Sequence, residues 1–133
     1  MNTLSFKLSL FYTYSLCLVM CFPLYGQTPI SYGDCITGSI DIPTETERYT
    51  LDVEAGEHFI IRMTPEGSVD PRVEIYNSVG TLITTEWSFG ETRIDYEVTA
   101  NDELTILASD NDGDDTGQYT ICIERTFCPT GTT

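Results

Sequence analysis

Short runs of alternating apolar and polar residues fill the chain from about residue 36 to residue 125. In the last run Tyr119, Ile121 and Ile123 alternate with polar or charged neighbours. A period of two is typical of a strand with one buried face and one solvated face. The runs are separated by turn signals rich in Gly, Pro, Asn and Asp. They predict strands at 36–42, 48–53, 58–63, 72–77, 81–85, 93–98, 103–109 and 118–125.

Eight short strands spaced about 8–12 residues apart indicate an all-β sandwich or barrel. The same alternation assigns the buried faces of individual strands. Val73 and Ile75 should face the core in one strand, and Ile94, Tyr96 and Val98 in another. A register slip of one residue would bury the charged neighbours, so we expect these registers to be well fixed.

The first 26 residues have the layout of a secretory signal peptide. Lys7 supplies a positive start, an apolar stretch occupies residues 8–22, and Gly26 offers a small residue near which cleavage is expected. The apolar stretch has 15 residues, fewer than the roughly 20 that a membrane-spanning helix needs. Acylation at Cys21 is a disfavoured alternative. We therefore expect a secreted or cell-surface protein with no membrane span after cleavage.

The charge balance narrows the classes of partner. The chain has 21 acidic residues and 6 basic ones, and its formal charge is −15. Cleavage near Gly26 would remove Lys7, the only lysine, and would leave five arginines and a charge of −16. A nucleic-acid binder or a binder of anionic membranes needs a basic face, so both classes are excluded. The 41% hydrophobic content excludes intrinsic disorder.

Cysteine usage fits export to an oxidising compartment. Cys35, Cys122 and Cys128 follow the expected cleavage point. Cys35 opens the first strand, Cys122 lies in the last, and Cys128 comes just after it. We predict a disulfide from Cys35 to Cys128 or to Cys122. Cys128 is favoured, because both partners would then lie at strand ends, where geometry is forgiving.

Four segments together resemble the bacterial pre-peptidase C-terminal domain. They are GSID at 38–41, RYTLDVEAGEHFIIRM at 48–63, VDPRVEIYNSVGTLI at 69–83 and DGDDTGQYTICIE at 112–124. The resemblance covers about residues 34–125, between a short lead at 27–33 and an irregular tail at 126–133. It implies a jelly-roll-like sandwich of about eight antiparallel strands, without an active site.

The resemblance also implies an accessory role. Such domains accompany secreted peptidases and other exported proteins, and relatives in collagenases bind collagen and calcium. The chain departs from the family in two ways: the expected signal leads almost directly into the sandwich, and the segment at 85–91 contains an unusual aromatic pair. The expected partner is an extracellular polymer, protein or glycan, or a companion catalytic domain.

An acidic loop at 109–117 is the candidate metal site. It reads SDNDGDDTG, and its carboxylates are Asp110, Asp112, Asp114 and Asp115. Clustered hard oxygen ligands on a flexible loop suit calcium, although the spacing is not that of an EF-hand. Asp34 and Asp70 are candidates to complete the site from other loops. The alternative is a solvated acidic hairpin between the last two strands.

Trp87 and Phe89 are the candidate polymer-binding residues. They lie two residues apart in a turn-like segment, and Tyr76, on the polar face of its strand, could join them. Exposed aromatic side chains can stack on sugars or grip a polymer. The alternative is that Trp87 and Phe89 plug one end of the sandwich.

Catalysis is not expected. After signal cleavage the chain would contain no lysine, and His58 is its only histidine. The triplet Asp115–Gly117 matches the aspartic-protease motif, but that chemistry needs two carboxylates sharing a proton. We therefore predict a non-catalytic accessory or binding module. The alternative is a structural or adhesive module of a larger cell-surface protein, and a small secreted hydrolase using Asp115 is a remote one.

Overall fold

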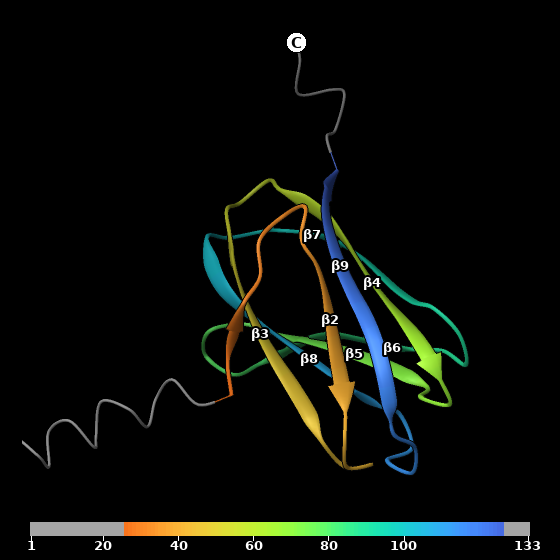
Figure 1. Ribbon diagram of the computed structural model, residues 1–133. Helices are drawn as coiled ribbons and strands as arrows, with labels where there is room; N and C mark the ends of the chain where they lie inside the picture. Colours follow the sequence, from red (N-terminus) through yellow and green to blue (C-terminus); the bar gives the residue numbers. More distant parts are fainter. Residues whose placement is uncertain (1–25, 127–133) are drawn as a thin grey trace, which may run out of the picture.

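The computed structural model describes residues 26–126, and every regular element in this range is a strand (Figure 1). The strands are β1 (Thr28–Pro29), β2 (Cys35–Ile40), β3 (Thr46–Val53), β4 (His58–Gly67), β5 (Pro71–Tyr76), β6 (Leu82–Trp87), β7 (Thr92–Glu97), β8 (Asp102–Asp110) and β9 (Gly117–Thr126). No helix in the described range is long and apolar enough to cross a membrane. The expected signal peptide up to residue 25, and Cys128, lie outside this range.

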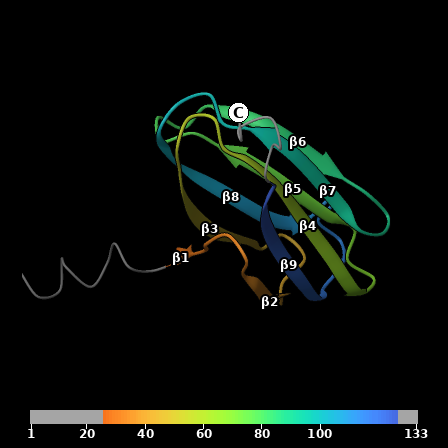
Figure 2. The same cartoon turned by 90° about the horizontal axis from the view of Figure 1, so that it is seen from above.

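The strands form two sheets packed face to face (Figure 2). One sheet has five strands in the order β1-β3-β8-β5-β6, and the other has four in the order β2-β9-β4-β7. The antiparallel pairs are nested along the chain: β2 with β9, β3 with β8, β4 with β7, and β5 with β6. This nesting defines a jelly roll and confirms the expected fold class.

All eight expected strands are present, with boundaries displaced by a few residues. The additional strand β1 is two residues long and pairs with β3 in parallel, too short to show alternation. β4 continues through Pro65 to Gly67, although the sequence indicates a turn there, because this stretch pairs with the start of β9. β2 ends at Ile40 and not at Ile42. There the Glu45 carboxylate accepts the backbone N–H groups of Asp41 and Ile42 at 2.6 and 3.3 Å.

The core lies between the sheets, on the faces that the alternation predicts. Tyr119, Ile121 and Ile123 are fully buried. The Tyr119 hydroxyl lies 2.7 Å from the Tyr49 hydroxyl, so each buried hydroxyl has a hydrogen-bond partner. Gly38 passes directly over Tyr119, where a Cβ atom would lie 2.4 Å from the tyrosine ring. Only glycine fits at this point of β2.

The disulfide joins Cys35 to Cys122, the second of the two pairings considered. The favoured pairing with Cys128 is therefore wrong. Cys35 and Cys122 lie directly opposite each other in the β2–β9 register, with Cα atoms 4.1 Å apart. Figure 1 shows β2 and β9 side by side. The bond links positions 87 residues apart, and a loop of this length contributes about 4–5 kcal/mol in the chain-entropy model.

Candidate metal site and binding surface

Both candidate groups lie at the same end of the sandwich. β4 ends at Gly67 opposite Gly117, the first residue of β9. At the start of β5, Pro71 lies opposite Asp110 and Arg72 opposite Trp87. The acidic connection between β8 and β9 and the aromatic connection between β6 and β7 therefore flank the same β4–β5 loop.

The acidic loop is a crossover between the sheets and not a hairpin. β8 belongs to the five-stranded sheet and β9 to the four-stranded sheet. Gly113 has φ +69, a left-handed backbone conformation that favours glycine. The alternative of a hairpin between the last two strands is wrong because these strands do not pair: β8 lies between β3 and β5, and β9 between β2 and β4.

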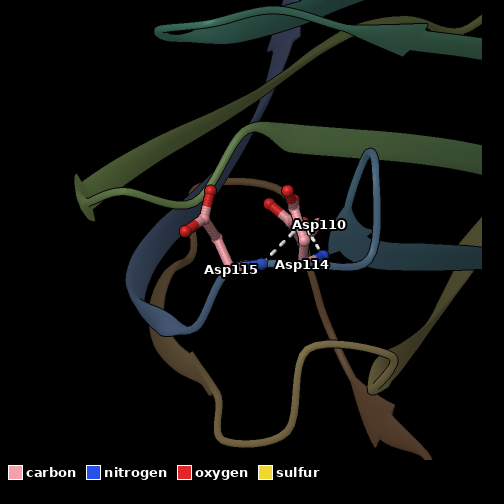
Figure 3. A group of neighbouring side chains, drawn as sticks. All are labelled: Asp110, Asp114 and Asp115. Atoms are coloured by element: carbon pink, nitrogen blue, oxygen red, sulfur yellow. Dashed lines mark hydrogen bonds between the residues drawn. The ribbon is translucent and has the colours of Figure 1, made fainter.

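Asp110 anchors this crossover through its carboxylate (Figure 3). One oxygen accepts the N–H of Asp70 at 2.8 Å, and the other accepts those of Asp114 and Asp115 at 3.0 and 3.2 Å. Burial acts to raise the pKa of Asp110, but these backbone donors outweigh it and lower the pKa below the usual range. Asp110 is therefore a charged, buried acceptor that fixes the loop.

Three of the four predicted ligands come together. One carboxylate oxygen from each of Asp110, Asp114 and Asp115 lies within 4.8 Å of the others, and Figure 3 shows these side chains projecting to the same side of the loop. Asp112 is outside this group and accepts a 3.3 Å hydrogen bond from Asn111. The group combines a buried, a half-buried and an exposed carboxylate.

The two carboxylates suggested as completing the site lie in different places. Asp70 is next to the group: its carbonyl accepts the N–H of Asn111 at 2.8 Å. Asp34 precedes β2 and accepts the N–H of Ser31 at 2.8 Å. The opposite end of β2, Ile40, is the one that pairs with Gly117. Six strand residues, about 20 Å, separate Asp34 from the loop.

Like charges crowd this group. Desolvation and then the neighbouring aspartates raise the pKa of Asp70 and of Asp114. Repulsion of this kind is relieved by a proton or by a bound cation. Calcium needs six to eight oxygens, so an ion here would take one or more from each carboxylate of the group and the remainder from water.

The aromatic pair is exposed at the corner where β6 crosses to β7. The rings of Trp87 and Phe89 are 5.2 Å apart between centroids and nearly perpendicular at 84°. The exposed fractions are 47% for Trp87 and 79% for Phe89. The rings contact each other but are not buried in the core, so the interpretation as an end plug is wrong.

This corner is fixed by hydrogen bonds to a single carbonyl. The Pro71 oxygen accepts the N–H of Ser88 at 3.2 Å and the hydroxyl of Thr92 at 2.6 Å. Thr92 is buried. Gly90 donates its N–H to the Ser88 hydroxyl at 3.1 Å. The aromatic pair is therefore carried on a short loop with both ends tied to β5.

Tyr76 lies on the outer face of the same sheet, farther from the corner. It is four residues beyond Arg72, which pairs with Trp87, so about 13 Å of strand separates the two positions. The Tyr76 hydroxyl donates to Glu74 at 2.9 Å, and Glu74 lies 3.6 Å from the Nε of Arg72. The hydrogen bond to Glu74 is the main cause that raises the pKa of Tyr76.

Sequence reasoning missed a hollow beside Tyr76. Its volume is about 370 Å³, and it is lined by Arg48, Tyr76, Asn77, Ser78, Gly80, Thr105 and Leu107. These residues come from β3, β5, β8 and the β5–β6 turn. Arg48 lies opposite Leu107 across β3 and β8, a register that no local sequence signal carries.

Comparisons with known proteins identify the fold. No protein-family model matches the chain, and no curated protein matches its sequence. Among solved structures, the pre-peptidase C-terminal domain of a collagenase from Bacillus anthracis matches with a TM-score of 0.64 and 13% identity, over 74% of this chain and 94% of that domain.

Periplasmic inhibitors of g-type lysozyme share the same architecture. The Aeromonas hydrophila inhibitor matches with a TM-score of 0.60 and 13% identity, over 75% of this chain and 97% of the inhibitor. The Salmonella Typhimurium inhibitor matches with a TM-score of 0.54 and 12% identity, over 75% of this chain and 98% of the inhibitor. In fold, the chain is similar to the pre-peptidase C-terminal domain, as its sequence motifs indicate.

Proposed function

We propose that this protein is an exported, non-catalytic binding module that attaches to an extracellular polymer through the Trp87–Phe89 corner. The observation that carries the proposal is the exposure of two large aromatic side chains on a loop held by Pro71. Aromatic anchors on a rigid support lose little conformational entropy on binding, and they dominate the energetics of many interfaces.

An extracytoplasmic location supports this role. The Cys35–Cys122 disulfide is typical of chains that fold outside the reducing cytoplasm. The expected signal peptide agrees with a secreted or cell-surface protein. The similar fold of the collagenase domain is that of a module attached to an enzyme.

A non-catalytic role fits the chemistry of the acidic group. The Asp110 carboxylate is committed to three backbone donors and is held in its charged form. Asp115, the residue of the protease-like triplet, has its backbone N–H tied to Asp110. The shared proton of an aspartic-protease pair requires two carboxylates in a site that stabilises one protonated partner, whereas here the buried member is stabilised as the anion.

Retention on insoluble polymers tests the proposed attachment. We expect the mature protein to be retained on at least one of chitin, cellulose and collagen fibrils, and Trp87→Ala/Phe89→Ala to reduce retention at least tenfold. Ile42→Ala is the matched control, because Ile42 is also a large exposed apolar residue, at 64%, but lies in the β2–β3 connection. Equal retention of the double variant and the parent would rule out the corner.

We also propose that calcium stabilises the module through Asp110, Asp114 and Asp115. Their proximity and the raised pKa of Asp114 support a cation at this point. Few protein ligands imply weak binding, of the order of 0.1–1 mM as in extracellular modules. Calcium at several millimolar should then raise Tm by mass action. An equal rise with matched magnesium, or an equal rise in Asp114→Asn/Asp115→Asn, would contradict a calcium site.

A protein partner is the second candidate. The observation that favours it is the match to nearly the full length of a lysozyme inhibitor, 97% for the Aeromonas hydrophila protein. The test is inhibition of a g-type lysozyme in a cell-wall lysis assay. Inhibition at a stoichiometric ratio, unchanged in Trp87→Ala/Phe89→Ala, would favour this function over polymer attachment.

A further inference from the structure

The outer face of the five-stranded sheet carries a second group of binding side chains beyond the aromatic corner. We call it the sheet-face patch and define it as Arg48, Arg72, Tyr76, Trp87 and Leu107. The strand registers place these residues on one surface: Arg48 is opposite Leu107, Leu107 is opposite Glu74, and Arg72 is opposite Trp87. The patch continues from the corner into the 370 Å³ hollow beside Tyr76.

The patch offers hydrogen-bond donors that the protein itself does not use. Arg48 is exposed and forms no hydrogen bond or ion pair with any residue in 26–126. The Nε of Arg72 is buried, so it is not accessible to a ligand, and its contact with Glu74 at 3.6 Å is an ion pair only. A ligand for this surface must therefore be rich in acceptor oxygens.

The charge distribution favours a ligand without net charge. Among the outward-facing positions of β3, β5 and β8, Glu74 lies within the patch, whereas Asp52 and Glu103 pair with each other toward the far end of their strands. With Arg48, Arg72 and Glu74 the patch carries a formal charge of +1, which is small beside the charge of −15 on the whole chain. The net negative charge of the molecule would repel a polyanion, and a polycation would bind to the acidic surface outside the patch.

The position of the patch favours a glycan over an extended peptide. Peptides that bind sheets commonly add a strand to an open edge and use its free backbone groups. β3, β5 and β8 are paired on both sides, and only β6, at the Trp87 end of the patch, is an edge strand, so most of the face presents side chains alone. Aromatic residues at strand positions about 13 Å apart along the backbone, with guanidinium and carboxylate groups between them, suit the apolar faces and hydroxyl groups of successive sugar units.

We propose that the sheet-face patch binds a neutral polysaccharide, one part of the chain contacting Trp87 and another occupying the hollow formed by Arg48, Tyr76 and Leu107. This inference rests on the proposed polymer attachment and specifies its ligand class and its path across the sheet. Arg48 and the Glu74–Tyr76 pair form hydrogen bonds with sugar hydroxyls, and the corner supplies stacking.

Depletion binding to chitin and microcrystalline cellulose tests the inference, with polygalacturonate gel and collagen fibrils as acidic and protein probes. We expect a Kd on a neutral glycan that changes less than about twofold between low and high salt, because no net charge is exchanged. Arg48→Ala and Tyr76→Ala should each weaken binding about tenfold, the effect of losing one or two hydrogen bonds or a stacking contact. Arg93→Ala is the matched control on the outer face of the other sheet, where Arg93 pairs with Asp95.

The outcomes separate this inference from the function on which it rests. Binding to collagen or to polygalacturonate alone would overturn the neutral-glycan inference but leave polymer attachment standing. Binding to a neutral glycan that Trp87→Ala weakens, but that Arg48→Ala and Tyr76→Ala leave unchanged, would overturn the path through the hollow. No binding to any probe would overturn both. Equal Tm values for the variants and the parent exclude misfolding as the cause of lost binding.

Discussion

Two connections at one end of the sandwich each cross from one sheet to the other, but different side chains hold them in place. The β8–β9 crossover is acidic and is held from inside by the Asp110 carboxylate. The β6–β7 crossover displays Trp87 and Phe89 and is held by hydrogen bonds to the Pro71 carbonyl, one of them from the buried Thr92 hydroxyl. Both crossovers are bonded to neighbouring residues of the β4–β5 connection. Asp70 bonds to Asp110 and Asn111, and Pro71 bonds to Ser88 and Thr92.

The difference separates the buried side chains that hold each loop from the exposed side chains that are available to a ligand. The buried acid is the anchor of its loop, and its exposed neighbours carry the repulsion. In the aromatic crossover, the buried polar residue Thr92 is the anchor, and the exposed rings contact only each other among the described aromatic pairs. In the aromatic loop the anchoring residue and the candidate binding residues are different, whereas Asp110 both anchors the acidic loop and belongs to the candidate calcium group.

Asp110→Asn should cause the largest loss of stability. An amide has one acceptor oxygen, so at least one of the backbone donors now served by the carboxylate loses its partner, and the remaining bonds lose their charge assistance. We expect the free energy of unfolding at pH 7 to fall by about 2–3 kcal/mol, measured by urea unfolding. A loss below 0.5 kcal/mol would show that Asp110 does not anchor the loop.

The pH dependence of the same variant sharpens this prediction. Because the folded state lowers the pKa of Asp110, its contribution is fully present above the unfolded value near 4 and is lost as pH falls through the lower folded pKa. The stability difference between Asp110→Asn and the parent should therefore shrink below about pH 4. A difference that stays constant down to pH 2 would contradict the lowered pKa.

Thr92→Val should cause an intermediate loss of stability. It removes the hydroxyl that donates to Pro71 at 2.6 Å while keeping the buried volume. We expect a loss of about 1 kcal/mol and greater mobility of the aromatic corner. Hydrogen exchange at the Ser88 amide, which shares the Pro71 carbonyl, measures that mobility, and unchanged exchange would mean that Thr92 does not hold the corner.

Phe89→Ala should change the free energy of unfolding less still, by no more than about 0.5 kcal/mol, because the ring is 79% exposed. Its effect should appear in polymer retention instead. A thermal melt and a retention assay on the same sample distinguish the two. A large loss of stability would mean that Phe89 belongs to the folded core and not to a binding surface.

Asp114→Asn should produce the smallest change, and in the opposite direction. The pKa of Asp114 is raised by desolvation and by its acidic neighbours, so its charge is unfavourable at pH 7 and the penalty disappears as pH falls through that raised pKa. The variant should melt slightly higher than the parent in chelator at pH 7, with no difference at pH 3. A lower Tm at pH 7 would mean that the carboxylate makes a favourable contact.

Much of the fold could be predicted because alternation is a local property. The period of two placed eight strands and assigned Val73, Ile75, Ile94 and Ile123 to the core, where all four are buried. The turn in the acidic loop was also readable from its composition, whereas the exposure of the aromatic pair was left open against an end plug and was decided by the structure. These features depend on residues within a few positions of each other.

The candidate sites could be predicted only in part, because their geometry joins residues far apart in the chain. Three of the four loop carboxylates meet, but Asp112 does not, since the Asp110 carboxylate binds the amides of Asp114 and Asp115 and so brings those two residues back to it. Arg48 and Tyr76 are 28 positions apart and meet only because β8 lies between their strands.

By itself the sequence determined an acidic, all-β chain with defined core faces, because side-chain polarity and strand period act locally. Only the tertiary structure decided that Cys35 pairs with Cys122, that the last two strands lie in different sheets, and that two arginines share a face with Tyr76 and Trp87. The reason is physical: alternation fixes which face of a strand is buried, whereas strand order and register depend on how both sheets together enclose one core.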